Sequence, residues 1–246
     1  MKLPLFSRTV LPTKLCLALL AEFVCCQGAS AQTWHSEISL SNEKTLRGIT
    51  VGRSVGSLGV GTHYYAEQKW FAGLAADTVK LASEQAHDVF LSADVGYQWL
   101  SGPEWSGQVF FAHYAYPFKH QLRDYKYDEI GTSFAYKSQF FLNLAWSPNG
   151  RAQTPGYAFQ KTDNRYNLSA VWRETIAPRW TVNLGVGASN YQTFQPALYH
   201  YAQLGLGYQW QQWQASLAYL VTDNTAKRNF VSRADNRFLA GIQFDF

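Results

Sequence analysis

The sequence has no cysteine beyond residue 26 and no long apolar run beyond residue 31. Its three cysteines are Cys16, Cys25 and Cys26, so the rest of the chain uses neither disulfides nor thiolate chemistry. No later segment approaches the roughly 20 apolar residues of a membrane-spanning helix, which excludes a helical membrane protein. Charge is also scarce, because only 15% of the residues are charged and the formal net charge is +4. Such a small charge gives no reason to expect a nucleic-acid partner.

The N-terminal region is typical of an export signal. Basic residues come first, then an apolar run, then a small-x-small pattern: Lys2, Arg8 and Lys14, Leu15 to Cys26, and Ala29-Ser30-Ala31. We therefore expect residues 1–31 to be a signal peptide and residues 32–246 to be one domain that enters an oxidising compartment. A lipid anchor at Cys25 or Cys26 is a disfavoured alternative, because Glu22 does not suit a lipobox.

From Gln32 onward, apolar and polar residues alternate with a period of two, which is the pattern of β-strands with one apolar face. This part of the chain also holds 38 of the 40 aromatic residues. The polar faces carry Gly, Ser, Asn and Gln more often than the Lys and Glu of a soluble sandwich. That composition favours the water-filled interior of a barrel.

The chain ends in such a strand. Four apolar residues on one of its faces are expected to carry an assembly signal: Phe238, Ile242, Phe244 and Phe246. Terminal residues usually fray, so a final aromatic residue indicates a partner strand or lipid that receives it. This ending resembles the C-terminal signal of bacterial outer-membrane barrel proteins. The resemblance implies the barrel-assembly machinery and periplasmic chaperones as partners.

The alternation predicts twelve strands, with ten or fourteen as alternative counts. Their approximate ranges are 33–41, 54–65, 70–78, 89–100, 105–116, 127–137, 139–147, 164–173, 179–190, 198–210, 213–222 and 236–246. Most have the ~9 to 11 residues that cross a bilayer when tilted. Short and long connections alternate, as in barrels with short periplasmic turns and long outer loops. We expect an all-β fold, namely a closed antiparallel transmembrane up-and-down β-barrel in the bacterial outer membrane.

The long connections carry positive charge. They cover about 42–53, 79–88, 117–126, 148–163, 191–197 and 223–235, with a combined net charge of +5. If they lie outside, they would either hold lipopolysaccharide phosphates, which is the favoured interpretation, or concentrate anionic solutes at a pore mouth. Whether 148–163 folds inward as a constriction is left open.

Tryptophan gives an independent indication of orientation. Eight of the nine lie at the expected periplasmic ends of strands: Trp34, Trp70, Trp99, Trp105, Trp172, Trp180, Trp210 and Trp213. Because indoles favour the membrane-water interface, this distribution predicts an aromatic girdle. The alternative is a soluble β-meander whose core aromatics flank its turns.

Catalytic and metal-binding patterns are missing from the sequence. It has no Gly-rich phosphate loop, no paired metal ligands and no CxxC motif, so we expect no enzymatic activity, no cofactor and no metal. A lipid hydrolase built on His200 would need a serine beside it on the lipid-facing side. The expected neighbours are Ala188, Asn190, Tyr219 and Val221, so an interfacial histidine is favoured. An outer-membrane lipid-modifying enzyme is the least favoured function.

The inward faces supply the candidate pore-lining residues. These are Glu37, Asp94, Glu129, Arg165, Arg173, Tyr199, Tyr201, Gln203 and Arg237. A charge that faces the lumen is tolerated because water or an opposite charge can reach it. Glu37 and Arg237 are expected to meet as an ion pair across the barrel closure. The charges either form a solvated stabilising network, which is favoured, or tune the ion preference of a pore.

Several short motifs carry a resemblance to a known family. They are Thr45-Leu46-Arg47-Gly48-Ile49-Thr50, Trp70-Phe71-Ala72-Gly73-Leu74, Asp94-Val95-Gly96-Tyr97, His113-Tyr114-Ala115-Tyr116-Pro117 and Tyr125-Lys126-Tyr127-Asp128-Glu129-Ile130. Over about residues 37–147 the chain resembles the TorF-type porins, proteobacterial outer-membrane proteins of uncharacterised function. The resemblance implies a β-barrel and a pore, and it supplies no catalytic residues and no agreed substrate.

Two functions follow from these patterns. The favoured one is an outer-membrane porin-like channel for passive diffusion of small hydrophilic solutes, with a preference for anions. The alternative is a plugged structural or surface-interaction barrel that binds lipopolysaccharide or a partner. Twelve strands are close to the size at which side chains and infolded loops can fill a lumen, so the sequence leaves both open.

Overall fold

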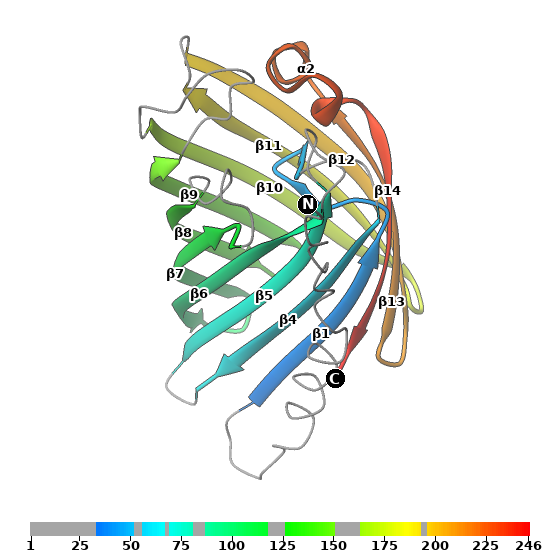
Figure 1. Cartoon of the computed structure of the whole chain (residues 1–246). Helices are drawn as coiled ribbons and strands as arrows, with labels where there is room; N and C mark the ends of the chain where they lie inside the picture. The colour runs from blue at the N-terminus through cyan, green and yellow to red at the C-terminus, as the bar shows by residue number, and fades with distance from the viewer. Residues whose placement is uncertain are drawn as a thin grey trace, which may run out of the picture. The chain divides into compact units, whose positions relative to one another are not determined.

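A computed structural model describes residues 33–51, 56–66, 69–80, 87–117, 126–150, 163–192 and 196–246. Twelve strands form a closed antiparallel barrel (Figure 1). They are β1 (Thr33–Ser41), β4 (Ser57–Tyr65), β5 (Trp70–Lys80), β6 (His87–Ser101), β7 (Trp105–Ala115), β8 (Tyr127–Tyr136), β9 (Phe140–Gly150), β10 (Asp163–Ala177), β11 (Trp180–Gln192), β12 (Pro196–Trp210), β13 (Trp213–Thr222) and β14 (Arg237–Asp245). The fold class and strand count predicted from the sequence are confirmed.

The predicted ranges differ from the observed strands mainly in length. β1 and β13 have the predicted bounds, whereas β6, β10 and β12 each extend to 15 residues. The expected signal peptide, 1–31, lies outside the described residues. Within the described part, no helix is long and apolar enough to cross a membrane.

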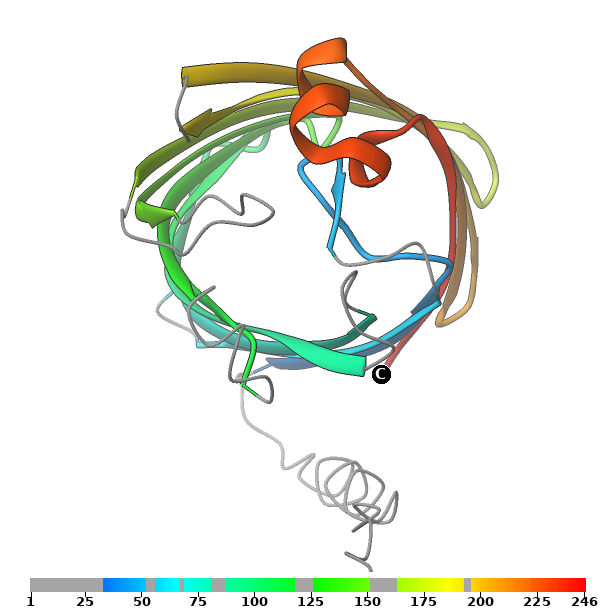
Figure 2. The same ribbon diagram turned by 45° about the horizontal axis from the view of Figure 1, so that its top comes forward.

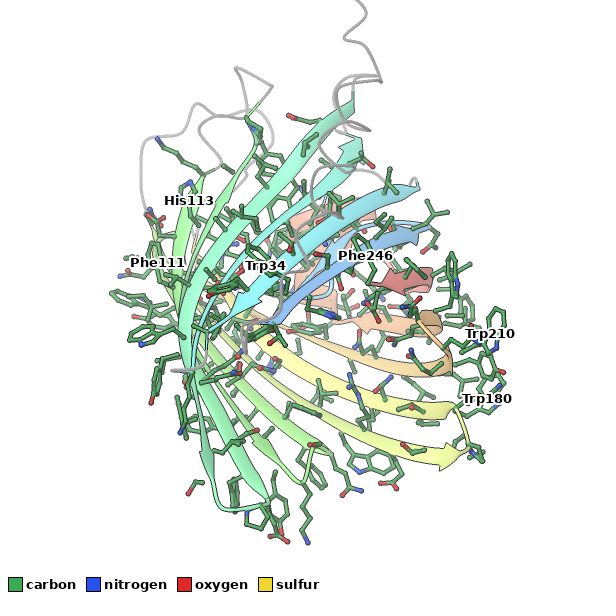
Figure 3. All side chains as sticks on the ribbon, turned by 90° about the horizontal axis from the view of Figure 1, so that it is seen from below. Trp34, Phe111, His113, Trp180, Trp210 and Phe246 are labelled. Atoms are coloured by element: carbon green, nitrogen blue, oxygen red, sulfur yellow. The ribbon has the colours of Figure 1, made fainter. Side chains whose placement is uncertain are left out.

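The outside of the barrel is apolar. Alternate residues of the strands expose large hydrophobic side chains, among them Leu74, Phe111, Leu168, Leu204 and Ile242. Figure 3 shows Phe111 on the outer side of β7. Leu74 and Leu204 keep 60% and 57% of their surface exposed, which water would penalise and a hydrocarbon layer accommodates. The barrel is therefore of the outer-membrane type.

The two ends of the barrel differ. At one end, called the turn end here, consecutive strands are joined by short turns. The turn between β8 and β9 places Lys137 and Ser138 at φ 52° and 54°, the left-handed pair that a two-residue hairpin of type I′ requires. The opposite end, called the loop end, carries the longer connections.

The loop end has local structure that the alternation did not predict. Between β13 and β14 the chain forms α2 (Asn224–Phe230) and η2 (Val231–Ala234) instead of an open loop. Asp223 caps α2, because its carboxylate accepts a hydrogen bond of 2.7 Å from the amide of Ala226. Between β1 and β4 the chain forms a small hairpin of β2 (Thr45–Leu46) and β3 (Ile49–Thr50).

Candidate functional site

The lumen is the candidate site, because it collects most polar and charged side chains of the strands. The segment 42–51, called the inner hairpin here, lies inside the ring of strands (Figure 2). The expectation that 42–53 forms an outer loop is therefore wrong for its described part. Arg47 and Gly48 form the tip, with φ 54° and 78°, the pair of left-handed residues that a tight hairpin turn needs.

Each charge of the inner hairpin has an opposite charge on a different strand. The guanidinium of Arg47 donates to the carboxylate of Glu129 on β8. Lys44 lies 2.6 Å from Asp77 on β5. Glu43 accepts a hydrogen bond of 3.0 Å from Arg237 on β14. Three strands from separate parts of the ring thus hold one ten-residue segment in place.

Thr50 adds a second set of bonds to this anchor. Its hydroxyl donates to Glu43 over 3.0 Å and accepts from Arg237, and its carbonyl accepts a 2.9 Å hydrogen bond from Arg233 of η2. Glu43 and Thr50 are buried. A buried carboxylate is stable only where donors compensate for its lost hydration, and here the hydroxyl and the guanidinium do so.

Apolar contacts brace the inner hairpin on two sides. Ile49 packs in one buried cluster with Tyr199 of β12, Ala226 and Ala234. Val51 packs in another with Val79 of β5 and Phe90 of β6. These clusters fill the loop end of the lumen with side chains. They make the inner hairpin part of the packed structure, unlike an outer loop that only solvent surrounds.

Gly48 makes the tightest approach of the inner hairpin to the wall. A methyl group added at Gly48 would lie 2.6 Å from Cβ of Tyr201 on β12, which is too close for two carbon atoms. The hydroxyl of Tyr199 donates to the carbonyl of Arg47 over 3.3 Å. Two residues predicted to line the pore therefore hold the tip of the hairpin.

The other predicted pore-lining residues lie in two settings. Glu129 and Arg237 are buried against the inner hairpin, where they pair with Arg47 and Glu43. Arg173 of β10 donates a 3.0 Å hydrogen bond to Asn183, and Asp94 of β6 lies 3.5 Å from Nε2 of His63. These side chains are partly exposed.

The expected ion pair between Glu37 and Arg237 is wrong. β1 and β14 are antiparallel, and their register places Glu37 opposite Asp245. Arg237 begins β14 at the loop end and binds Glu43 instead. The alternation of each strand predicts which face a residue occupies but not the stagger between the first and last strands.

The lumen carries charges of both signs, and neither sign is confined to one wall, since Glu129 lies on β8 and Arg237 on β14. Arg165 and Arg173 lie on β10, and β10 is six places from β4 in the ring. The strands around β4 carry further carboxylates, with Glu37 on β1, Asp94 on β6 and Asp245 on β14.

The turn end of the lumen contains a cavity of about 380 Å³. Its lining mixes amide and hydroxyl side chains with three aromatic rings, and includes Gln98, Gln108, Ser133, Asn143, Trp99, Phe134 and Phe141. A cavity with this lining can hold water and small polar molecules. Residues 151–162, most of the 148–163 connection, lie outside the described residues, so the question whether this connection folds inward stays open.

The eight tryptophans of the predicted girdle lie towards the turn ends of their strands. Several pair with an aromatic residue of the adjacent strand: Trp34 with Tyr64, Trp70 with Tyr97, Trp105 with Tyr136, Trp180 with Tyr208, and Trp213 with Phe244. Figure 3 shows Trp180 and Trp210 on the outside of the barrel. This band is placed where an interfacial girdle would be.

The C-terminal strand is held to its last residue. The amide of Phe246 donates to the carbonyl of Ser36 over 2.9 Å, and the amide of Ser36 donates back to Phe246 over 3.1 Å. The ring of Phe246 stacks with that of Phe244 at 5.9 Å between centroids. The terminal aromatic residue thus has the partner strand that the sequence predicted.

His200 lies on the outer surface and contacts an acid rather than a serine. Its Nδ1 is 3.0 Å from the carboxylate of Asp223. A shallow groove of about 610 Å³ runs beside it and is lined by small side chains, including Ala170, Ala188 and Ala202. Larger apolar side chains, among them Leu142, Leu168 and Val186, line the same groove. The hydrogen bonds described for His200 go to Asp223.

Comparison with solved structures agrees with this geometry. A "KdgM porin in complex with disordered oligogalacturonate" aligns with a TM-score of 0.53 at 10% identity, over 88% of this chain and 99% of that one. A "NanC porin" aligns at 0.54 and 10% identity, over 85% and 97%. The "COG4313 outer membrane channel from Pseudomonas putida F1" aligns at 0.50 and 8% identity, over 89% and 96%. The chain has the fold of porin-type outer-membrane barrels.

Sequence comparison adds no closer relationship. No protein-family model matches the chain, and no curated protein matches it. At sequence identities of 8 to 10%, the similarity to these solved structures establishes a shared fold alone.

Proposed function

We propose that this chain is an outer-membrane channel of porin type, through which small hydrophilic solutes diffuse passively. The observation that carries the proposal is a closed barrel with an apolar outer surface and a lumen lined by charged, amide and hydroxyl groups. Neighbours with this fold are named as porins and channels, which supports a channel rather than an enzyme. The TorF-type motifs fit the same proposal, because Arg47 and Gly48 of the first motif form the tip of the inner hairpin.

In this proposal the inner hairpin is the constriction. It occupies the loop end of the lumen, whereas the turn end keeps the cavity between β6 and β9. A solute would pass between the hairpin and the wall, where the charged side chains of the lumen act on it. Anion preference would come from the positive outer loops. The case for an anion preference is weaker than the sequence suggested. Glu43, Lys44 and Arg47 were counted with the outer loops, but they form ion pairs inside the lumen.

Conductance measurements test the proposal. The full chain is exported, purified from outer membranes in detergent and added to a planar bilayer. We expect discrete single-channel steps, and a reversal potential in a salt gradient that reports the anion preference. A folded barrel that gives no steps would contradict the channel.

The plugged barrel is the second candidate, and the depth of the anchor favours it. Arg47, Glu129, Glu43 and Arg237 are almost fully enclosed, and that degree of burial suits a permanent plug. Liposome swelling with sugars of increasing size separates the two functions. The channel admits small sugars and excludes large ones, and the plug excludes all of them.

The proposed partners follow from the location of the barrel in the outer membrane. Lipopolysaccharide would contact the loop end, and the barrel-assembly machinery and periplasmic chaperones would act during export. The lipid-modifying enzyme would require activity that depends on His200. We expect purified barrel and a His200→Ala variant to release no fatty acid from phospholipid vesicles.

A further inference from the structure

The barrel closure brings together three side chains with metal-binding chemistry. His35 and Glu37 lie two residues apart on β1, so they share its inward face. Asp245 of β14 is the residue opposite Glu37. One imidazole and two carboxylates, separated by about 200 residues of sequence, therefore meet inside the turn end of the lumen.

Their ligand atoms are close to one another. The imidazole nitrogen of His35 and one carboxylate oxygen each from Glu37 and Asp245 all lie within 4.8 Å of one another. Nε2 of His35 is 3.8 Å from Oδ1 of Asp245. Around a zinc ion with bonds of about 2.0–2.2 Å, ligand atoms lie roughly 3.3 Å apart. A small movement of the exposed His35 imidazole would bring the ligand atoms from their present separations to that distance.

The side chain of Gln243 holds the two carboxylates in place. Its amide nitrogen donates to Glu37 over 2.8 Å and to Asp245 over 2.7 Å. On the other side of β1, Gly61 of β4 leaves room for Glu37, since a Cβ there would lie 3.3 Å from its side chain. The metal-facing atoms are thus supported by neighbours that are not themselves ligands, as is usual in protein metal sites.

The carboxylates of this cluster lack the lysine or arginine partners of the carboxylates that hold the inner hairpin. Glu43, Asp77 and Glu129 each pair with a lysine or an arginine. Among the ion pairs that the structure describes, Glu37 and Asp245 have no such partner, and one neutral amide bridges them. Two adjacent carboxylates repel each other, so a bound cation would relieve that repulsion.

From this geometry we propose that His35, Glu37 and Asp245 bind a first-row divalent transition metal ion such as Zn²⁺ inside the turn end of the barrel. An imidazole nitrogen with carboxylate oxygens is a donor set that these ions accept, whereas Mg²⁺ and Ca²⁺ prefer oxygen ligands alone. The remaining coordination positions face the lumen and are open to water. The site does not depend on whether the lumen conducts.

The test is a titration of Zn²⁺ into the detergent-solubilised barrel, prepared from the full chain without a histidine tag and followed by calorimetry. We expect one Zn²⁺ per barrel, with no competition from Mg²⁺. His35→Ala and Asp245→Asn should weaken binding at least ~10-fold, and Gln243→Ala by ~10–100-fold as a positioning residue. Binding that is missing in the parent, or that is unchanged in His35→Ala and Asp245→Asn, overturns the proposal.

A second histidine-carboxylate pair supplies the matched control. Nδ1 of His113 lies 2.6 Å from Asp128, and His113 shares the outward face of β7 with Phe111 (Figure 3). No third ligand joins that pair in the described residues, so His113→Ala should leave Zn²⁺ binding unchanged. If the His35→Ala variant does not assemble, two measurements still test the site. They are Zn²⁺ binding to Asp245→Asn and the visible spectrum of Co²⁺ added to the unaltered barrel. A spectrum of hydrated Co²⁺ alone refutes the site.

Discussion

Arg47 and Glu129 are 82 residues apart in the sequence, and their side chains form an ion pair inside the barrel. The pair joins the tip of the inner hairpin to β8. With 9% and 5% of their side-chain surface exposed, both charges depend on each other rather than on water. The position of the inner hairpin, and part of the stability of the barrel, therefore depend on this contact.

Removing one partner of this pair should be costly. Arg47→Ala leaves Glu129 buried without its cation, so we expect the free energy of unfolding to fall by about 3–5 kcal/mol. Urea-dependent unfolding in detergent micelles measures this, and single-channel conductance should rise as the hairpin loosens. Lys137→Ala breaks the exposed pair with Glu104 in a turn, and it should change the free energy of unfolding far less, because water screens both charges. Equal losses in the two variants would contradict the assigned role.

Replacing both charges should be less harmful than replacing one. In an Arg47→Met, Glu129→Leu double variant no charge remains buried, so the loss of unfolding free energy should be smaller than for Arg47→Ala. The same urea titration decides. A double variant that is less stable than either single variant would indicate that the ion pair itself supplies net stability.

Substitutions at Gly48 and Gly102 distinguish the cost of a steric clash from the cost of backbone strain. Both have a left-handed φ, 78° and 69°, but a Cβ at Gly48 would meet Tyr201 at 2.6 Å and one at Gly102 would meet nothing within 4 Å. Gly102→Ala should therefore cost about 1–2 kcal/mol from the backbone alone, and Gly48→Ala distinctly more. The urea midpoints of the two variants measure the difference, and similar midpoints would show that the hairpin tip can shift away from β12.

The cap of α2 should respond to pH. Burial raises the pKa of Asp223, but the hydrogen bonds from Ala226 and His200 outweigh it, so the pKa lies below the ordinary 3.8. The ionised cap therefore stabilises α2 above that value, and the stabilisation is lost as the pH falls through the lowered pKa. Amide exchange of Ala226 should show protection at pH 7 that declines in acid.

Two variants at this position distinguish the cap from its charge. Asp223→Asn keeps a capping oxygen, so protection of Ala226 should persist in acid without the pH dependence. Asp223→Ala removes the oxygen and should lower helix stability by about 1 kcal/mol at pH 7. Protection that is the same in both variants would rule out the cap.

Phe246 should matter for assembly. Because its backbone pairs with Ser36 and its ring stacks on Phe244, Phe246→Ala removes the aromatic end of the closing strand. We expect less folded barrel in the outer membrane, measured as the heat-modifiable band on gels of membrane fractions. Phe134→Ala, on the exposed outer face of β8, is the control. An unchanged level for Phe246→Ala would show that the terminal ring is dispensable.

The sequence could predict the twelve strands because a period of two assigns each side chain to one of two faces. Leu204 and Gln203, for example, were placed on the outer and inner faces from alternation alone, and the barrel agrees. The inner hairpin was missed, since Glu43 to Val51 is too short and too polar to reveal whether it folds inward or outward. Arg47-Gly48 does indicate a tight turn, but the need for an acidic partner follows only from the burial of Arg47, which the structure reveals.

The sequence by itself determined the strands, their apolar face, the band of tryptophans and the aromatic end, because each of these depends only on the order of neighbouring residues. The tertiary structure decided which strands meet and in what stagger. It placed Glu37 opposite Asp245 rather than Arg237 and brought Arg47 to Glu129. It also assembled His35, Glu37 and Asp245 from the first and last strands of the barrel. Those contacts depend on how the ring closes, a property of all twelve strands together that no local pattern encodes.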